Sequence, residues 1–230
     1  MIGWVAMAAV ISAQAGQAEH QMPPVKATAV SSIPAASVSG NVITHLGEKV
    51  RVRVPEKATY VGTERFNLYG VADAEIHVFV EADAAKKMQR LYWVQFESYL
   101  PDNDHRYNYF DGNTRFDLWG APTWLVWGPR STSAPYRAGG DRESVMRILS
   151  RGGYTIPAEV LNVRMVQMLD DPEGSGRGRR ELMIIYSEDL APTGKTVAEL
   201  SADGKVNDAF KPIEKPLIDL ATTSVSVERL

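Results

Sequence analysis

The chain has 230 residues, of which 44% are hydrophobic and 23% charged, with a net charge of −3 and no cysteine. This composition is typical of a globular protein and excludes an intrinsically disordered chain. Without cysteine there are no disulfides, thiolate metal sites or cysteine nucleophile, and the balanced charge gives no electrostatic reason to expect a nucleic-acid partner.

The first twenty residues predict export. An apolar run over residues 2–11 is followed by SAQAGQA, which places small residues at −3 and −1 for cleavage after Ala15 or Ala18. This is the layout of a secretory signal peptide, and the run is too short for a transmembrane helix, which needs about 20 residues. No Lys or Arg precedes the run, which is atypical, and the alternative is an apolar N-terminal helix docked on the core.

We therefore expect a signal peptide over residues 1–18, a flexible Pro/Ala/Ser-rich leader over 19–46 and a single α+β domain over 47–230. The expected location is periplasmic or secreted, with no transmembrane segment. Folding should start near Glu48.

Short strands dominate the predicted domain. Residues 49–54 alternate valines with cations, and residues 75–81 alternate again, with Ile76, Val78 and Val80 on one face. Turn residues separate the further β-branched and aromatic segments. The predicted strands are 49–54, 60–71, 75–81, 91–99, 107–110, 115–118, 123–127, 161–169 and 181–187.

One helix is predicted after these strands. Asp141 is a natural N-cap, Val145, Ile148 and Leu149 share one face, and Gly152 ends the helix. Residues 195–200 should form one or two helical turns, and the prolines 212 and 216 should interrupt any long helix between residues 206 and 220. Residues 182–186 lack polar alternation, which indicates a central strand covered on both faces.

Strands outnumber helices, and most of the connections are too short for parallel crossovers. The predicted fold class is α+β: a strongly curved or barrel-like antiparallel β-sheet with one or two packed helices.

Eleven of the twenty aromatic residues lie between Tyr92 and Trp127, which predicts either the core or the lining of a ligand cavity. If the apolar side of 75–81 shares a face with Val94 and Phe96, the opposite face collects polar groups and large rings. On this basis the expected function is non-catalytic binding of a small, partly apolar ligand in the concavity of the sheet. The expected lining is Trp93, Gln95, Glu97, Tyr99 and His77.

Two other functions stay open. A cell-envelope enzyme would use His77 with Glu75 or Glu97 as an acid–base pair. A protein–protein interaction module would instead dock an envelope partner through an exposed aromatic patch in the region 119–127. Trp124 and Trp127 are three residues apart, so in a regular strand they face opposite sides of the sheet.

No metal site and no cofactor is predicted. The segment Asp102-Asn103-Asp104-His105 has Arg106 where a calcium ligand would be needed. The Gly194-Lys195-Thr196 segment lacks the first glycine of a phosphate-binding loop, because that position is Asp189. No nucleophile-elbow motif occurs. The loop 128–140, with Arg130, Arg137 and Arg142, is read as a connector, with an anion-binding lid as the alternative.

Overall fold

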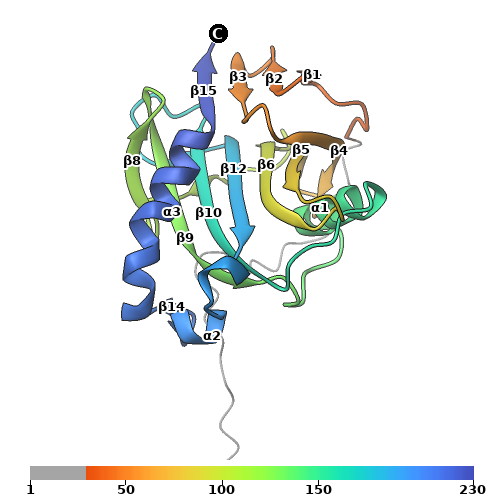
Figure 1. The fold of residues 1–230 in the computed structure, drawn as a ribbon. Coiled ribbons are helices and arrows are strands. Elements are labelled where there is room, and N and C mark those ends of the chain that lie inside the picture. Colours follow the sequence, from red (N-terminus) through yellow and green to blue (C-terminus); the bar gives the residue numbers. More distant parts are fainter. Residues whose placement is uncertain (1–29) are drawn as a thin grey trace, which may run out of the picture.

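The structure is a computed structural model that describes residues 30–230, so the predicted signal peptide and the first part of the predicted leader, residues 19–29, lie outside the described residues. Its largest element is a seven-stranded antiparallel sheet (Figure 1). In spatial order the strands are β4 (Thr59–Leu68), β5 (Ala72–Ala82), β6 (Met88–Tyr99), β12 (Arg180–Asp189), β10 (Glu159–Met168), β9 (Ala121–Ser131) and β8 (Thr114–Leu118).

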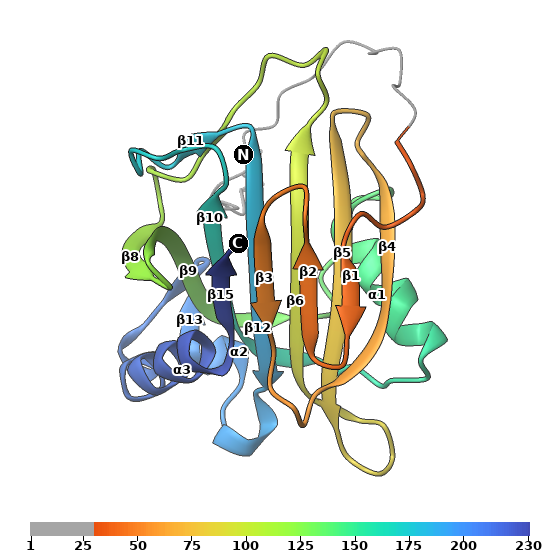
Figure 2. The ribbon, with the colours of Figure 1, turned by 90° about the horizontal axis from the view of Figure 1, so that it is seen from above.

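A four-stranded antiparallel sheet packs on one face of the large sheet (Figure 2). Its strands in spatial order are β1 (Ser37–Ser39), β2 (Val42–His45), β3 (Val50–Arg53) and β15 (Ser226–Arg229). The prediction that folding starts near Glu48 is wrong, because β1 and β2 lie inside the range expected to be a leader. The two segments are too short and too weakly apolar for the sequence to mark them as strands. Sheet pairing stabilises them, because β1 pairs with β2 and β2 pairs with β3.

The two faces of the large sheet bury different cores. We call the face covered by the four-stranded sheet the inner face, where Ile43 and Val52 pack against Tyr92, Val94 and Tyr186. We call the other face, which carries α1 (Asp141–Arg151), the outer face; there Val145, Ile148 and Leu149 of the helix meet Ile76 and Val78. Both faces are therefore hydrophobic, so hydrophobicity alone does not decide which side of a strand faces which core.

The helices differ from expectation in two details. Asp141 is the first residue of α1, and the N-cap is Gly140, which has no side chain with which to cap the helix. The predicted interruption of the last helix is also wrong, because α3 (Lys211–Ser224) continues through Pro216. Pro212 lies in its first turn, where the missing N–H costs no hydrogen bond, and burial of Leu217 and Ala221 against the inner face compensates for the second proline.

The remaining elements are short. They are β7 (Tyr107–Asn108), β11 (Arg177–Gly178), β13 (Ser201–Ala202), β14 (Lys205–Val206), α2 (Val197–Leu200) and the 3₁₀ turns η1 (Ala191–Thr193) and η2 (Asp208–Phe210). The predicted turns at residues 195–200 are confirmed by α2, which begins at a Thr196–Glu199 capping box.

The α+β class and the antiparallel pairing are confirmed. The barrel expectation is wrong: in the described residues the large sheet is open, with β4 and β8 at its two edges. The central position predicted for residues 182–186 is confirmed, because β12 lies between β6 and β10 and both of its faces are buried.

Candidate functional site

The strand register separates the predicted ligand-lining residues. In the β5–β6 pair, His77 lies opposite Val94, Glu75 opposite Phe96 and Ile76 opposite Gln95. Directly opposed residues point to the same side of a sheet. His77 therefore lies on the inner face, whereas Trp93, Gln95, Glu97 and Tyr99 lie on the outer face, and the predicted five-residue wall is not formed.

His77 and Glu75 do form a pair, inside the core. His77 Nε2 lies 2.9 Å from Glu75 Oε1, and the Tyr60 hydroxyl lies 3.4 Å from His77 Nδ1. Glu75 also accepts hydrogen bonds from the backbone N–H groups of Ala35 (2.5 Å) and Ala36 (2.8 Å). Burial works to raise the pKa of Glu75, but these hydrogen bonds outweigh it and the pKa is lowered. The pair thus fixes the N-terminal segment to the sheet.

Little space is open beside this pair. Glu75 lines a cavity of about 90 Å³, together with His45, Glu48 and Arg65, and His77 itself is fully buried. A cavity of this size holds a few water molecules and not a substrate. Of the alternative partners proposed for His77, Glu75 is in contact and Glu97 is on the opposite face.

A second polar group lies on the outer face, and we call it the acid–tyrosine cluster: Glu97, Glu181, Tyr107 and Tyr109. Glu97 of β6 and Glu181 of β12 are directly opposed in the register. The Tyr107 hydroxyl donates to Glu97 Oε1 over 2.6 Å, and the hydroxyl of Tyr109 acts on the pKa of Glu181. Two carboxyl groups that face each other across adjacent strands destabilise a sheet when both are charged, so this pairing requires a physical explanation.

The predicted residues Trp93, Gln95 and Tyr99 lie around this cluster. Trp93 Nε1 donates to Gln95 Oε1 over 2.9 Å, and Gln95 Nε2 donates to Glu97 Oε2 over 2.6 Å. The ring of Tyr99 stacks on that of Tyr107 with 4.4 Å between centroids. Both oxygens of Glu97 are therefore occupied by donors, and the residue is partly buried beside the aromatic rings.

The electrostatics of the cluster are strongly perturbed. Burial raises the pKa of Glu97 to about 7, and the nearby charge of Asp141 acts in the same direction. Burial also raises the pKa of Glu181 well above its ordinary value, and the charge of Glu97 adds to this shift. The positive charge of Arg164 lowers the pKa of Glu181, against the effect of burial. Even so, Arg164 Nε and Glu181 Oε2 are both buried without a hydrogen-bond partner among the described residues.

The segment that covers the cluster, residues 101–113, connects β6 to β8, and we call it the strap. Its β7 pairs with β11, and the Tyr109 N–H donates to Gly176 O over 2.9 Å. The Arg179 guanidinium donates to the carbonyl oxygens of Leu100, Asn103 and His105. The strap is therefore fixed to the loop that precedes β12 as well as to the carboxyl pair.

A larger cavity, of about 350 Å³, lies at the end of the large sheet where β9 begins and β10 ends. We call it the rim groove. Trp124 forms one wall and packs so closely on Gly176 that a Cβ there would lie 2.7 Å from the indole ring. Its lining includes Pro122, Trp124, Met168, Leu169, Pro172 and Arg229.

Two charged residues line the rim groove. Asp171 is occupied, since its oxygens accept from the Ser175 hydroxyl (3.1 Å) and the Gly176 N–H (2.7 Å). Arg229 Nη2 donates only to Gln167 Oε1, over 3.3 Å, and none of the described carboxylates lies within ion-pair distance of it. Arg229 therefore presents to the groove a guanidinium that has no ion-pair partner among the described residues, and the charge of Glu48 acts on it only from beyond ion-pair distance.

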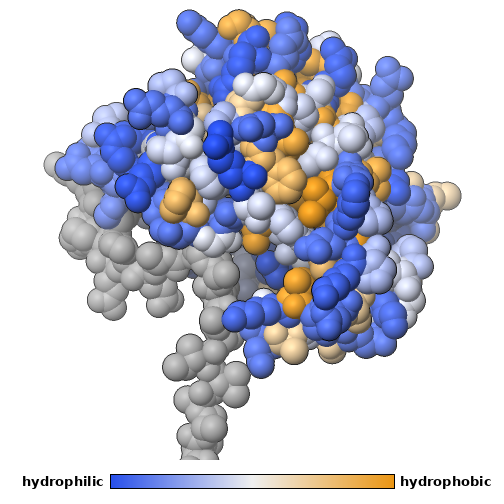
Figure 3. Space-filling model, turned by 90° about the vertical axis from the view of Figure 1, so that its left-hand side faces the viewer, coloured by the Kyte–Doolittle hydropathy of each residue, from blue (hydrophilic) through white to orange (hydrophobic). Residues whose placement is uncertain are grey.

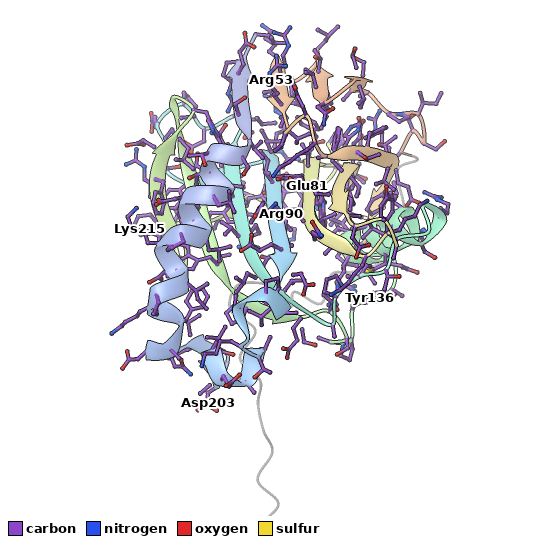
Figure 4. The ribbon with its side chains drawn as sticks, in the orientation of Figure 1. Arg53, Glu81, Arg90, Tyr136, Asp203 and Lys215 are labelled. Carbon is purple, nitrogen blue, oxygen red and sulfur yellow. The ribbon has the colours of Figure 1, made fainter. Side chains whose placement is uncertain are left out.

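A third buried ionic group is self-contained. Glu81 and Arg90 are opposed in the β5–β6 register and 2.9 Å apart, and Figure 4 shows them beneath the small sheet. Glu81 also accepts from the Tyr92 hydroxyl (2.6 Å), and Arg90 donates to the Tyr186 hydroxyl (3.1 Å). Because its charges have opposite-charge or hydrogen-bond partners, this group stabilises the core and offers no free group to a ligand.

The aromatic region expected to dock a partner is largely covered. Trp124 is 4% exposed, and Trp127 is partly buried with Nε1 donating to Glu214 of α3 over 2.7 Å. The two rings lie on opposite faces, as the spacing predicts. Figure 3 shows the side of the molecule that carries β8 and α3, where apolar areas are interrupted by polar side chains.

No local pattern in the sequence marks Glu181, Tyr109 or Arg229 as a site residue. Each is separated from its partners by a long stretch of chain, and only the strand order brings them together. Among the described residues, no group of His, Asp and Glu side chains is arranged to hold a metal ion. None of the described helices has the length and apolar character needed to cross a membrane.

Comparison of the chain with protein-family models, with curated proteins and with solved structures finds no match. Functional argument therefore rests on the geometry of the sites described above.

Proposed function

We propose that the protein binds a small ligand with an apolar body and one negatively charged group, and that the ligand occupies the rim groove. The observation that carries this proposal is the guanidinium of Arg229, which has no ion-pair partner among the described residues and lies in the same groove as the wall formed by Trp124. The ligand class is close to that expected from the sequence, but the site lies at the end of the sheet instead of over the middle of β6.

The dimensions and chemistry of the groove support this class of ligand. Its volume of about 350 Å³ lies at the lower end of the range of about 300–1,000 Å³ that is usual for small-molecule sites. The indole of Trp124 and the rings of Pro122 and Pro172 offer flat apolar surface. A guanidinium binds carboxylate, sulfonate or phosphate oxygens through two parallel hydrogen bonds, which fixes the orientation of the ligand.

Two matched fluorescent probes test this proposal. 8-Anilinonaphthalene-1-sulfonate has an apolar body and one anionic group, and N-phenyl-1-naphthylamine has nearly the same body without the charge. We expect the anionic probe to bind about tenfold more tightly, since a hydrogen bond to a charged group contributes about 1.5–3 kcal/mol. In Arg229→Gln the difference between the probes should disappear.

Arg51→Gln is the control, because Arg51 lies on the neighbouring strand β3 and is paired with Glu228. It should leave both affinities unchanged. An Ala121→Trp variant, which places a large ring in the groove, should weaken both probes together. Equal effects of Arg229→Gln and Arg51→Gln would show that the anionic probe binds elsewhere, and the proposal would then be wrong.

We also propose that the chain is exported, so that it would meet its ligand outside the cytoplasm. This proposal rests on the apolar run and small residues of the N-terminal segment, which lies outside the described residues. Intact-mass measurement of the protein from the extracytoplasmic fraction of its host tests it: a chain beginning at Gly16 or Glu19 supports processing, and a chain that retains Met1 contradicts it.

A further inference from the structure

The strap touches both the acid–tyrosine cluster and the rim groove. On one side Tyr107 donates to Glu97 over 2.6 Å. On the other side the ring of Phe110 lies 6.1 Å from that of Trp124, edge to face, and the Tyr109 N–H bonds the carbonyl of Gly176. Movement of the strap away from the sheet would therefore remove a ring that supports Trp124, the aromatic wall of the groove.

The charge balance of the cluster limits how many negative charges it can hold. Three carboxyl groups, Glu97, Glu181 and Asp141, influence one another, and the cation that acts on both Glu181 and Asp141 is Arg164. A pair of like charges directly opposed across two strands is destabilising. The titratable and charged groups that face the carboxyl pair are Tyr69, Tyr99, Tyr107, Tyr109, Asp141 and Arg164.

The hydrogen bonds indicate where a retained proton resides. Both oxygens of Glu97 accept hydrogen bonds, from Tyr107 and from Gln95, which suits an ionised carboxylate. Glu181 is 2% exposed, and its Oε2 has no donor directed at it among the described residues. A protonated carboxyl group suits such a site better than a carboxylate, because burying a neutral group without a hydrogen bond costs less than burying a charged one.

We infer that Glu97 and Glu181 form a proton-controlled latch, in which one proton shared by the pair keeps the strap closed on the sheet and its loss releases the strap from the groove wall. The inference rests on the proposed ligand function only in its last step, the effect on the groove. When the strap opens, both carboxyl groups reach water and the pair releases the proton that it retained, so the closed state is the one that binds this proton.

The direction of the pH dependence follows from the raised pKa of each carboxyl group. Burial raises the pKa of Glu97 to about 7 and that of Glu181 well above its ordinary value, so the closed state holds more protons than the open state. The closed state is favoured below the ordinary glutamate pKa of 4.5 and loses its advantage as the pH rises through 7. For each proton released, the opening equilibrium shifts about tenfold per pH unit in this window.

Hydrogen exchange of the intact protein tests the latch without any ligand. We expect the protection of the Tyr109 amide, corrected for the intrinsic exchange rate, to fall about tenfold per pH unit between pH 5.5 and 7. The amide of Ile184 in the central strand should keep constant protection, because it reports on global unfolding. In the double variant Glu97→Gln with Glu181→Gln, which cannot ionise, the protection of Tyr109 should not change with pH.

Two further variants complete the test. Glu228→Gln, at an exposed position on β15, should follow the wild type. Tyr107→Phe removes a donor from the latch and should lower the protection of Tyr109 already at pH 5.5, which keeps the test decisive if the double variant fails to fold. The inference is overturned if the wild-type strap shows no pH dependence, or if the double variant keeps the dependence of the wild type.

The effect of the latch on ligand binding in the rim groove is measured separately. Binding of 8-anilinonaphthalene-1-sulfonate should weaken between pH 5.5 and 8 in the wild type and stay constant in the double variant. If the strap opens and this affinity does not change, the regulatory link is wrong. The proposed function itself is judged by the comparison of Arg229→Gln with Arg51→Gln, so the two failures are distinguishable.

Discussion

Replacement of Glu75 by alanine should loosen the whole N-terminal segment, although the residue lies on the fifth strand. Its carboxylate accepts hydrogen bonds from two backbone N–H groups and from His77, at 2.5–2.9 Å, and the residue is 3% exposed. Hydrogen bonds to a charged group contribute about 1.5–3 kcal/mol each, but the Ala35 N–H is near solvent and can turn to water. We expect Glu75→Ala to lower the free energy of unfolding by about 2–4 kcal/mol.

Urea unfolding followed by tryptophan fluorescence measures this difference at pH 7. Glu228→Ala is the control, because its ion pair with Arg51 is exposed and should contribute less than about 1 kcal/mol. Limited proteolysis should cut the variant more rapidly near Ala35. A loss below about 1 kcal/mol, equal to that of the control, would refute the reasoning that this carboxylate anchors the segment.

The same contact has a defined pH dependence. The pKa of Glu75 is lowered, so its contribution to stability is present above the ordinary glutamate value of 4.5 and is lost as the pH falls through the lowered pKa. The difference between wild type and Glu75→Ala should therefore shrink between pH 5 and pH 3. This dependence is opposite in sign to that of the latch carboxyls, whose raised pKa weakens the closed strap as the pH rises.

Two further predictions use matched pairs. Gly176→Ala should destabilise the fold by about 2 kcal/mol or more, because its φ is +76° and the new Cβ would lie 2.7 Å from Trp124, whereas Gly112→Ala, at φ +78° in open space, should cost about 1 kcal/mol. Leu217→Ala should cost about 2–5 kcal/mol through the cavity it leaves under α3, and Leu220→Ala, 38% exposed on the same helix, less than about 1 kcal/mol. Thermal or urea unfolding checks both pairs, and equal losses within either pair would contradict the packing described.

Local signals predicted much of the fold. Turn residues between alternating segments predicted the strands that became β5 and β6, and the apolar run 182–186 predicted a central strand. The strand order has no comparable local signal. After β6 the chain crosses to the far edge, builds β8, β9 and β10, and only then returns with β12 to fill the gap beside β6. The opposition of Glu97 and Glu181 is created by this return.

The continuous helix α3 contains Pro216, which the sequence predicts should interrupt it. The missing N–H and the ring of Pro216 oppose a helix at that position, and the prediction of an interruption follows correctly from those two facts. What it leaves out is the burial of Leu217 and Ala221 against the inner face, together with the bond from Trp127 to Glu214. Tertiary contacts of this kind outweigh a local cost of about 3 kcal/mol.

The error in the predicted ligand wall has a single physical origin. Alternation assigns the residues of each strand to two faces, but it does not state which face of one strand joins which face of the next. Where one side of a sheet meets water, hydrophobicity makes that choice. Here the inner and outer faces are both buried, so Val94 and Trp93 are equally acceptable beside the apolar side of β5.

The choice is made instead by the connection between the two strands. The register shifts by one residue between Glu81 and Ala82, next to the loop that leads to Met88, and an irregularity of that size changes which faces meet. This one-residue shift places His77 with Glu75 in the closed core and leaves Glu97 free to meet Glu181 under the strap. A residue inserted into the loop 83–87 should therefore be absorbed there, as loops are, because a transmitted shift would move Glu97 to the inner face, away from Glu181, and Val94 to the outer face.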